Sequence, residues 1–251
     1  MINLTQDKRP DSTKPIEPLD PSQLGELRAW SYSALKVFEE CPYRSYIARV
    51  KGIKEPSSPA ADRGTQIHQE AEDYVNGKIG ELPSSLEKFK DDFEELRQLF
   101  NEAKVELEGE WGFDTAWQPV GWMQKETWAR IKLDALVNET ETSARVIDYK
   151  TGKIYGNEIP HSQQCLLYAI ATFMRYPHIE FVQTELWYLD HGEITKKQFT
   201  REEAMHFAPG FHSRAIKMTT ETEFEPTPSK DSCRWCSFKD GDEPQCRWGV
   251  K

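Results

Sequence analysis

Two runs of strand-forming residues flank a polar turn in the middle of the chain, and apolar and polar positions alternate along the first run. The first run covers residues 129–136, and in the second Val146 and Ile147 lead into the polar residues 148–150. Residues 138–143 between the runs have the composition of a turn. Because a period of two residues is typical of a half-buried strand, the pattern predicts a β-hairpin here.

Helical periodicity dominates the N-terminal part of the chain. A helix is predicted to begin at Ser31, and a second is predicted over residues 63–68 and beyond with Thr65 as its N-cap. Apolar residues then recur at intervals of three and four over residues 86–107. This spacing predicts one long amphipathic helix that ends at Gly109.

After the hairpin, the pattern predicts a helix, a second strand pair and a final helix. The first helix follows Pro160, and the strands cover residues 180–189 and 193–199. A capping box at residues 200–203 opens the final helix, which is expected to be disturbed at residues 209–210, a Pro-Gly pair.

The composition indicates a soluble globular protein with an acidic balance. The chain has 251 residues, 37% of them hydrophobic and 29% charged, with a formal net charge of −10. No apolar run is long enough to span a membrane, and the N-terminus lacks an apolar signal segment, so we expect a cytoplasmic protein. The negative charge argues against a protein that coats nucleic acid, although a local basic strip could still follow a phosphate backbone.

Proline content divides the sequence into an arm and a domain. Residues 1–27 carry four prolines among charged and hydroxyl side chains, which predicts a flexible or wrapping arm. Residues 28–251 are expected to form a single domain. Four tryptophans between residues 111 and 128 are interpreted as core packing rather than as a stacking surface for bases.

The predicted hairpin brings two carboxylates and an amine together. Asp134 lies on its first strand, and Asp148 and Lys150 are two residues apart on the second, hence on one face. Carboxylate oxygens are suitable ligands for Mg²⁺ or Mn²⁺. Such a metal can activate a water and neutralise charge on a phosphate, while the lysine can hold the water or the developing anion.

This stretch resembles the core of the PD-(D/E)xK nuclease superfamily. Asp134, thirteen intervening residues and then Asp148-Tyr149-Lys150 are similar to its D…(D/E)-x-K signature. The run Asp-Tyr-Lys-Thr-Gly resembles specifically the RecB-type branch. That branch often has a glycine three residues before the first aspartate, where this chain has Ile131.

Two further motifs match the RecB-type branch in the same order. His68 lies in an Arg-Gly-Thr-x-x-His run, whose histidine joins the acidic residues at the metal in that branch. Gln164 and Tyr168 are four residues apart on one helical face and match its Q-x-x-x-Y element. The motifs cover most of the chain, which strengthens the resemblance.

The resemblance implies an α/β fold with a restriction-endonuclease-like core, in which a small mixed sheet is flanked by helices next to a helical N-terminal part. It implies a Mg²⁺- or Mn²⁺-dependent deoxyribonuclease, expected to be an exonuclease in DNA recombination, repair or processing. Lys150 would orient the attacking water, and Gln164 and Tyr168 would position the substrate. The implied metal ligands are His68, Asp134, Asp148 and the backbone carbonyl of Tyr149.

Four of the five cysteines are candidate ligands of a second centre. Cys233 and Cys236 form a C-x₂-C pair and Cys246 follows, so a fourth ligand is needed, and four thiolates accept either a [4Fe–4S] cluster or zinc. Cys41, in a Cys-Pro-Tyr context, resembles the first cluster ligand of RecB-type nucleases. The resemblance therefore implies a [4Fe–4S] cluster, with zinc the lesser alternative, that ties the C-terminal tail to the N-terminal part. Cys165 is interpreted as a buried apolar residue.

The resemblance also indicates partners and two alternatives. DNA is the expected substrate, and a recombination or CRISPR-type protein is a candidate partner. The first alternative is a catalytically silent DNA- or protein-binding module, and the second is a phage protein that acts against a host defence complex. The intact set of Asp134, Asp148 and Lys150 favours the enzyme, because a decayed site usually loses one of these residues.

Overall fold

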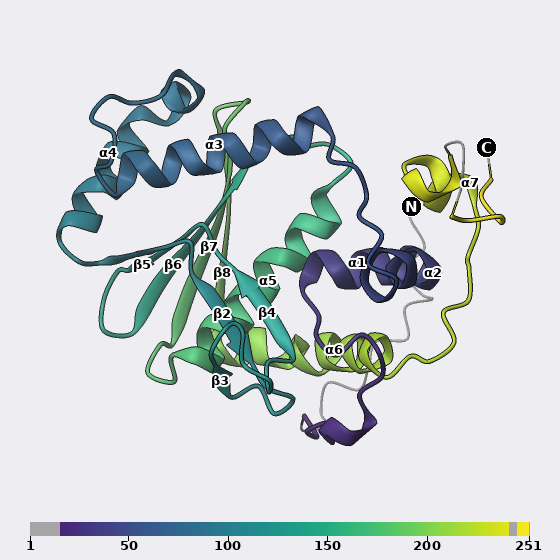
Figure 1. Cartoon of the computed structure of the whole chain (residues 1–251). Coiled ribbons are helices and arrows are strands. Elements are labelled where there is room, and N and C mark those ends of the chain that lie inside the picture. The colour runs from purple at the N-terminus through teal and green to yellow at the C-terminus, as the bar shows by residue number, and fades with distance from the viewer. Residues whose placement is uncertain (1–15, 241–244, 251) are drawn as a thin grey trace, which may run out of the picture. The chain divides into compact units, whose positions relative to one another are not determined.

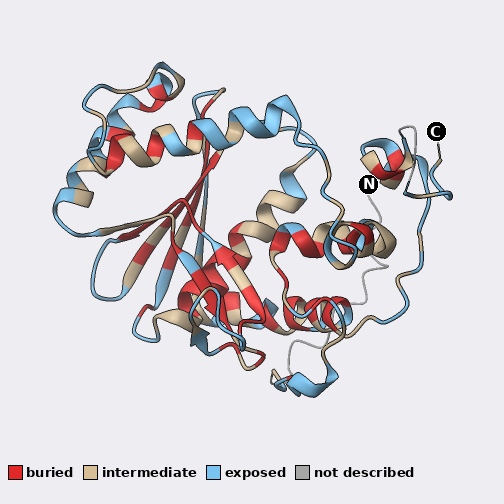
Figure 2. Cartoon of the chain, in the orientation of Figure 1, coloured by how far each residue is buried: buried red, intermediate tan, exposed pale blue. Residues whose placement is uncertain are grey.

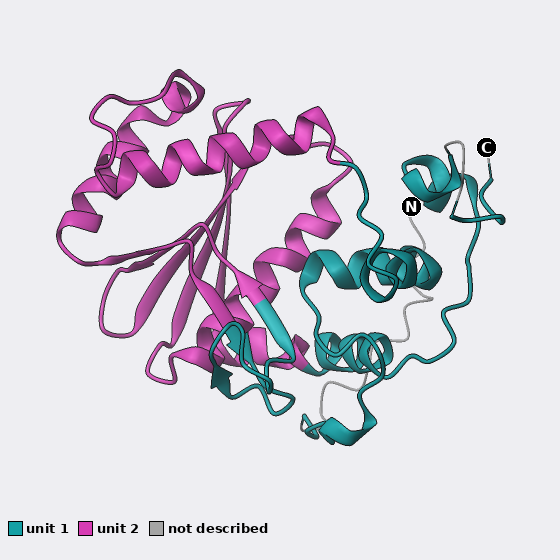
Figure 3. Ribbon diagram, in the orientation of Figure 1, with its two compact units in different colours: residues 1–56, 112–130, 209–251 teal, residues 57–111, 131–208 magenta. Residues whose placement is uncertain are grey.

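The computed structural model describes residues 16–240 and 245–250 (Figure 1). The chain divides into two compact units (Figure 3). Unit 1 comprises residues 1–56, 112–130 and 209–251, and unit 2 comprises residues 57–111 and 131–208. Each unit is thus assembled from segments that are far apart in the sequence. The predicted arm lies largely outside the described residues, but Leu19 and Leu27 at its end are buried.

Unit 2 is built on a five-stranded mixed sheet with the order β1-β5-β6-β7-β8. The strands are β1 (Val105–Leu107), β5 (Ala135–Asn138), β6 (Ser143–Lys150), β7 (Phe181–Tyr188) and β8 (Glu193–Thr200). β6 and β7 are parallel, whereas the other neighbouring pairs are antiparallel. A parallel pair needs a long crossover, which α5 (Glu158–Arg175) supplies. The predicted α/β fold with a small mixed sheet is confirmed.

Helices cover both faces of this sheet. A core cluster that includes Ile67, Phe93 and Trp187 joins one face to α3 (Pro59–Val75), η3 (Ser84–Phe89) and α4 (Lys90–Asn101). On the other face, Cys165 of α5 packs with Leu186 and Tyr188. Figure 2 shows the buried residues of unit 2 concentrated on the strands and along α5. The central strands β6 and β7 are therefore largely buried.

A second sheet has three short strands in the order β3-β2-β4. They are β2 (Glu110–Phe113), β3 (Pro119–Val120) and β4 (Ala129–Lys132). The first strand of the predicted hairpin is thus divided: β4 belongs to the small sheet, and β5 pairs with β6 in the large one. The hairpin is confirmed for β5 and β6, and residues 133–134 form the break.

Tryptophans form the centre of unit 1. Trp30, Trp117 and Trp128 meet edge to face, with ring centroids 5.7–6.0 Å apart. The indole of Trp117 donates to His212 Nδ1 at 3.2 Å, and that of Trp128 donates to Thr219 Oγ1 at 3.0 Å. The interpretation as core residues is confirmed for Trp111, Trp117 and Trp128, whereas Trp122 is only half-buried.

The remaining elements of unit 1 are short helices and part of one long helix. They are η1 (Pro21–Gln23), α1 (Tyr32–Glu40), α2 (Pro42–Ser45), the π-helical turn η2 (Tyr46–Val50), the C-terminal part of α6 (Arg201–Thr219), α7 (Lys230–Arg234) and η4 (Ser237–Lys239). Ser31 caps α1 as predicted, by accepting from the Ala34 amide. No helix among the described residues has the length and apolar character that crossing a membrane requires.

Three predictions about helix boundaries need correction. Ser58 caps α3, and Thr65 lies inside that helix. The helix predicted over residues 86–107 ends at Asn101, because the backbone turns at Ala103 (φ 58°) and residues 105–107 pair with β5. The capping box of α6 is confirmed, but the assigned helix continues through Pro209.

We expect the core of unit 2 to be sensitive to truncation at Phe93, which is fully buried against Tyr149 and Trp187. Phe93→Ala should lower the free energy of unfolding by about 3–5 kcal/mol, because it leaves a cavity among these rings. Denaturant unfolding measures this loss. Phe181→Ala is the matched control, since Phe181 is 54% exposed and should cost much less. Equal losses in the two variants would contradict this description of the core.

Candidate active site

Asp134 lies in the break between β4 and β5, at one end of the large sheet. Its Oδ2 accepts a hydrogen bond from the Tyr149 amide at 2.6 Å, and its Oδ1 is 2.9 Å from His68 Nδ1. Its own carbonyl accepts from the Glu108 amide at 2.9 Å. Asp134 is only 8% exposed. The break in the strand thus turns a buried carboxylate toward the neighbouring strand and α3.

His68 and Asp134 affect each other's protonation. Burial lowers the pKa of His68, but the hydrogen bond and charge of Asp134 raise it above its usual value overall. Burial raises the pKa of Asp134, as does the nearby charge of Asp148, although His68 opposes this rise. The effect of Asp148 on this pKa indicates that the two aspartates are electrostatic neighbours, as the hairpin predicted.

Asp148 is held from two sides on β6. Its Oδ2 is 2.5 Å from Lys150 Nζ, and its Oδ1 accepts from the Tyr168 hydroxyl at 2.6 Å. Gln164 accepts from Lys150 Nζ at 2.9 Å and donates to the Tyr168 hydroxyl at 2.7 Å. The Q-x-x-x-Y pair on α5 therefore braces the D-x-K pair on β6. The structure brings these four sequence-predicted residues into one network.

The network also fixes charge states. Burial lowers the pKa of Lys150, but the charge and hydrogen bond of Asp148 raise it above its usual value, so the side chain is an ammonium ion. Burial and the negative charges of Asp148 and Asp134 hold the pKa of Tyr168 well above its usual value. Tyr168 is therefore a permanent hydrogen-bond donor to Asp148.

Glu108 is a site residue that the sequence analysis missed. His68, Glu108 and Asp134 each offer one possible ligand atom, and these three atoms lie within 4.8 Å of one another. Glu108 follows β1 and has a left-handed backbone (φ 49°), which is uncommon for a residue with a side chain. Its carboxylate pairs with Lys132 Nζ at 2.7 Å, and burial raises its pKa.

A cleft of about 420 Å³ lies over these donors. It is lined by residues of α3 together with Glu108, Lys132 and Asp134. Gly64 of α3 is close to the loop after β6, because a Cβ atom there would lie 3.1 Å from Thr151 Oγ1. The glycine of the Arg-Gly-Thr run thus allows the helix that carries His68 to approach the end of β6.

Comparison with known proteins places this arrangement in a family. The model of the PD-(D/E)XK nuclease superfamily matches residues 29–241. The chain belongs to this superfamily. None of the curated proteins searched matches the chain.

Solved structures of other proteins show distant likeness. A crystal structure of SSO0001 has a TM-score of 0.48 and 18% identity, covering 89% of this chain and 88% of that one. An alkaline exonuclease from Laribacter hongkongensis, LHK-Exo, has a TM-score of 0.38 and 13% identity, covering 78% and 89%. The structure of the same exonuclease in complex with dAMP has a TM-score of 0.38 and 14% identity, and it covers 78% of this chain and 89% of that one.

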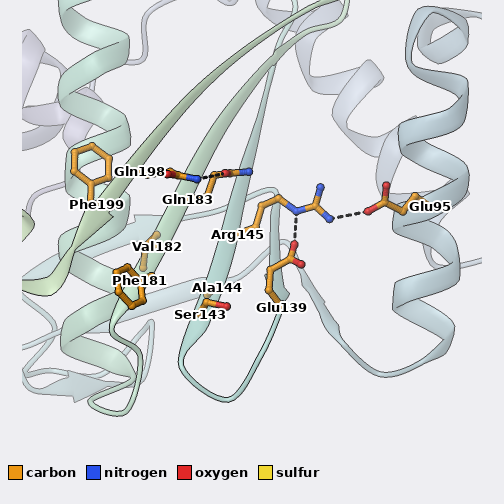
Figure 4. Close-up of a pocket in the computed structure, with 10 residues that line it drawn as sticks. All are labelled: Glu95, Glu139, Ser143, Ala144, Arg145, Phe181, Val182, Gln183, Gln198 and Phe199. Carbon is orange, nitrogen blue, oxygen red and sulfur yellow. Dashed lines mark hydrogen bonds and ion pairs between the residues drawn. The ribbon is translucent and has the colours of Figure 1, made fainter.

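A second cavity in unit 2 has a different character. It has a volume of about 480 Å³ and includes the start of β6, roughly 16 Å along the strand from Asp148. There Arg145 pairs with Glu139 at 2.6 Å and with Glu95 at 2.9 Å (Figure 4). Both partners neutralise the guanidinium, so this cavity lacks the chemistry of a nuclease site.

The cysteines fall into two groups, four around one cavity and Cys165 in the core of unit 2. Cys41, Cys233, Cys236 and Cys246 all line one cavity in unit 1. A hydrogen bond from the backbone of Val250 lowers the pKa of Cys233. By contrast, Cys165 is 1% exposed in the core of unit 2, which confirms its interpretation as a buried apolar residue.

Tyr168→Phe should lower the free energy of unfolding by about 1.5–3 kcal/mol, because it removes a buried hydrogen bond to a carboxylate. Thermal or denaturant unfolding provides the measurement. Tyr176→Phe is the control at the C-cap of the same helix: its hydroxyl donates to Glu106 Oε2 at 3.0 Å in a half-buried setting, and its loss should cost about 1 kcal/mol or less. A Tyr168 variant as stable as the parent would show that this contact does not support Asp148.

Proposed function

We propose that this chain is a metal-dependent deoxyribonuclease that hydrolyses phosphodiester bonds with Mg²⁺ or Mn²⁺. The observation that carries the proposal is the joint placement of Asp134, Asp148 and Lys150 at one end of the sheet, with His68 bonded to Asp134. Membership of a nuclease superfamily and this intact set favour an enzyme over a silent binding module.

The donor atoms fit a hard divalent cation. The proposed ligands are His68, Asp134, Asp148 and the backbone carbonyl of Tyr149, and Glu108 is added as a further donor. Asp134 is buried near the negative charge of Asp148. A bound cation would therefore reduce the repulsion between these two carboxylates. Carboxylate oxygens suit both Mg²⁺ and Mn²⁺.

The side chains around the metal would have different roles. When bound, the metal would lower the pKa of a coordinated water and neutralise charge on the phosphate. The Lys150 ammonium, held by Asp148 and Gln164, would orient the attacking water and stabilise negative charge that develops in the transition state. Tyr168 would keep the Asp148 carboxylate in place, and Gln164 and Tyr168 together would position the substrate.

The finer assignment rests on the motifs. The order of the five motifs supports the RecB-type branch, and within it we propose an exonuclease that acts in DNA recombination, repair or processing. A recombination or CRISPR-type protein would be its partner. None of the five cysteines forms a disulfide, which suits a reducing compartment such as the cytoplasm.

Purified protein should degrade labelled DNA with Mg²⁺ or Mn²⁺ and stop when a chelator is added. Asp148→Asn should reduce cleavage at least about 100-fold, because it removes a charged metal donor and the partner of Lys150. Asp91→Asn, an exposed change on α4, should leave the rate unchanged. Cleavage by the Asp148 variant at the parental rate would exclude this site.

The metal ligands can be tested without cleavage. His68→Ala and Glu108→Gln should each raise the dissociation constant for Mn²⁺ by about tenfold or more, as measured by titration calorimetry or electron paramagnetic resonance. Glu94→Gln, on the exposed face of α4, is the control for the second variant. If Glu108→Gln binds Mn²⁺ like the parent, Glu108 serves only as the partner of Lys132.

We also propose that the four cysteines of unit 1 bind a [4Fe–4S] cluster. Cys41, Cys233, Cys236 and Cys246 line one shared cavity, and four thiolates accept either a cluster or zinc. The resemblance to RecB-type nucleases favours the cluster, with zinc as the lesser alternative.

Anaerobically purified protein should be brown and contain iron and sulfide. Cys41→Ser should bleach it and make residues 225–251 sensitive to protease, because ligation joins Cys41 to the C-terminal segment. Cys165→Ser should keep its colour, since Cys165 lies in unit 2. A colourless protein with one bound zinc would replace the cluster with a structural zinc site, and colour that survives loss of Cys41 would mean that the fourth ligand is another residue.

A further inference from the structure

The tripeptide Cys-Arg-Trp occurs twice near the C-terminus, at residues 233–235 and 246–248. In both copies the arginine stacks on the tryptophan that follows it. The guanidinium carbon is 5.2 Å from the ring centroid in the Arg234–Trp235 pair and 4.6 Å in the Arg247–Trp248 pair. The nuclease assignment uses only the cysteines, so the two arginine–tryptophan pairs need a separate explanation.

Both pairs are fixed to the same small part of unit 1. The cysteines that precede them line one cavity, together with Cys41. The Trp248 ring meets Tyr43 of α2 edge to face at 5.0 Å, and the Cys246 amide donates to the Phe238 carbonyl at 2.9 Å. The two pairs are therefore presented by one local structure rather than by free chain.

These tryptophans differ from the others in their exposure. Trp235 is 78% exposed and Trp248 is 37% exposed, whereas the five tryptophans of the cores are at most 1% exposed. Leaving a ring of this size in water forgoes the free energy that its burial would provide. An exposed ring beside a guanidinium is instead the arrangement that single-stranded nucleic acid binders use.

The charge of this segment also differs from that of the chain. Residues 230–251 carry five cations, Lys230, Arg234, Lys239, Arg247 and Lys251, against four carboxylates, Asp231, Asp240, Asp242 and Glu243. The whole chain has a net charge of −10. A segment of slightly positive charge in a strongly acidic chain, with two exposed indoles that each lie beside a guanidinium, suits a polyanion that has accessible aromatic faces. Bases of a duplex are stacked on one another, so a single strand offers these faces and a duplex does not.

We propose that the two Cys-Arg-Trp segments form a binding surface for single-stranded DNA. Trp235 and Trp248 stack on bases, and Arg234 and Arg247 contact phosphates. Cysteine ligation orders the surface, because each pair directly follows a proposed ligand. This inference deepens the proposed nuclease function by naming the form of DNA that the chain binds, and it uses residues outside the proposed catalytic set.

Fluorescence anisotropy with a labelled oligothymidine tests the proposal on the full chain, purified anaerobically and kept without added divalent metal. Trp235→Ala and Trp248→Ala should each weaken binding at least about fivefold. Arg234→Gln and Arg247→Gln should also weaken it and reduce its dependence on salt. Trp122→Ala is the matched control, since Trp122 has Arg130 over its ring at 5.7 Å but lies outside the two segments. Its affinity should equal that of the parent.

The iron content and circular dichroism of each variant show whether the cysteine centre and the fold are intact. An unchanged affinity of Trp235→Ala with intact protein would overturn the proposal, as would equal losses in the Trp122 variant. Capture of a protein that depends on Trp235, with unchanged DNA affinity, would reassign the surface to protein docking. Binding is measured without metal, so it does not depend on cleavage. Trp235-dependent binding can therefore be observed in a protein that does not cleave DNA, and cleavage can be observed in a protein whose DNA binding does not depend on Trp235.

Discussion

The Asp134 carboxylate is the group on which the rest of the site depends. It sits where the chain leaves the small sheet for the large one, and it accepts from the Tyr149 amide of β6 while meeting His68 of α3. One buried carboxylate thus joins the strand break, the neighbouring strand and a helix. Burying such a charge is costly unless it is hydrogen-bonded, so the three elements have to remain in register for the fold to be stable.

The site has three carboxylates and two lysines, so its charge is balanced only when His68 is protonated. Lys150 pairs with Asp148, and Lys132 pairs with Glu108. His68 is the basic group that pairs with Asp134. Burial is the main cause of the raised pKa values of Asp134 and Glu108, and the charge of a neighbouring aspartate adds to each. A divalent cation would offset the charge of these carboxylates, and the preorganised Lys150 would then face the reacting phosphate in a setting where little reorganisation is needed. The buried carboxylates at this end of the sheet therefore cost folding free energy and at the same time supply the donors that would bind the cation.

Local periodicity was sufficient for much of the fold and for the residues that recur at fixed spacing. Asp148 and Lys150 share a face because a strand has a period of two, and Gln164 and Tyr168 reach them because a helix brings every fourth residue together. Glu108 was missed because the helical spacing of α4 appeared to continue into residues 105–107. Pairing with β5 decided the conformation of that segment, and such a long-range contact leaves no local signal.

The most direct test of the central claim is a crystal structure with Mn²⁺ and its anomalous scattering. The account predicts one strong peak within bonding distance of Asp134, Asp148 and His68, roughly 2.2 Å from their donor atoms. Substitution of Asp148 by Asn should weaken that peak while leaving the protein structure unchanged. Mn²⁺ bound to other residues, with no peak between Asp134 and Asp148, would contradict the assignment of this end of the sheet as the catalytic centre.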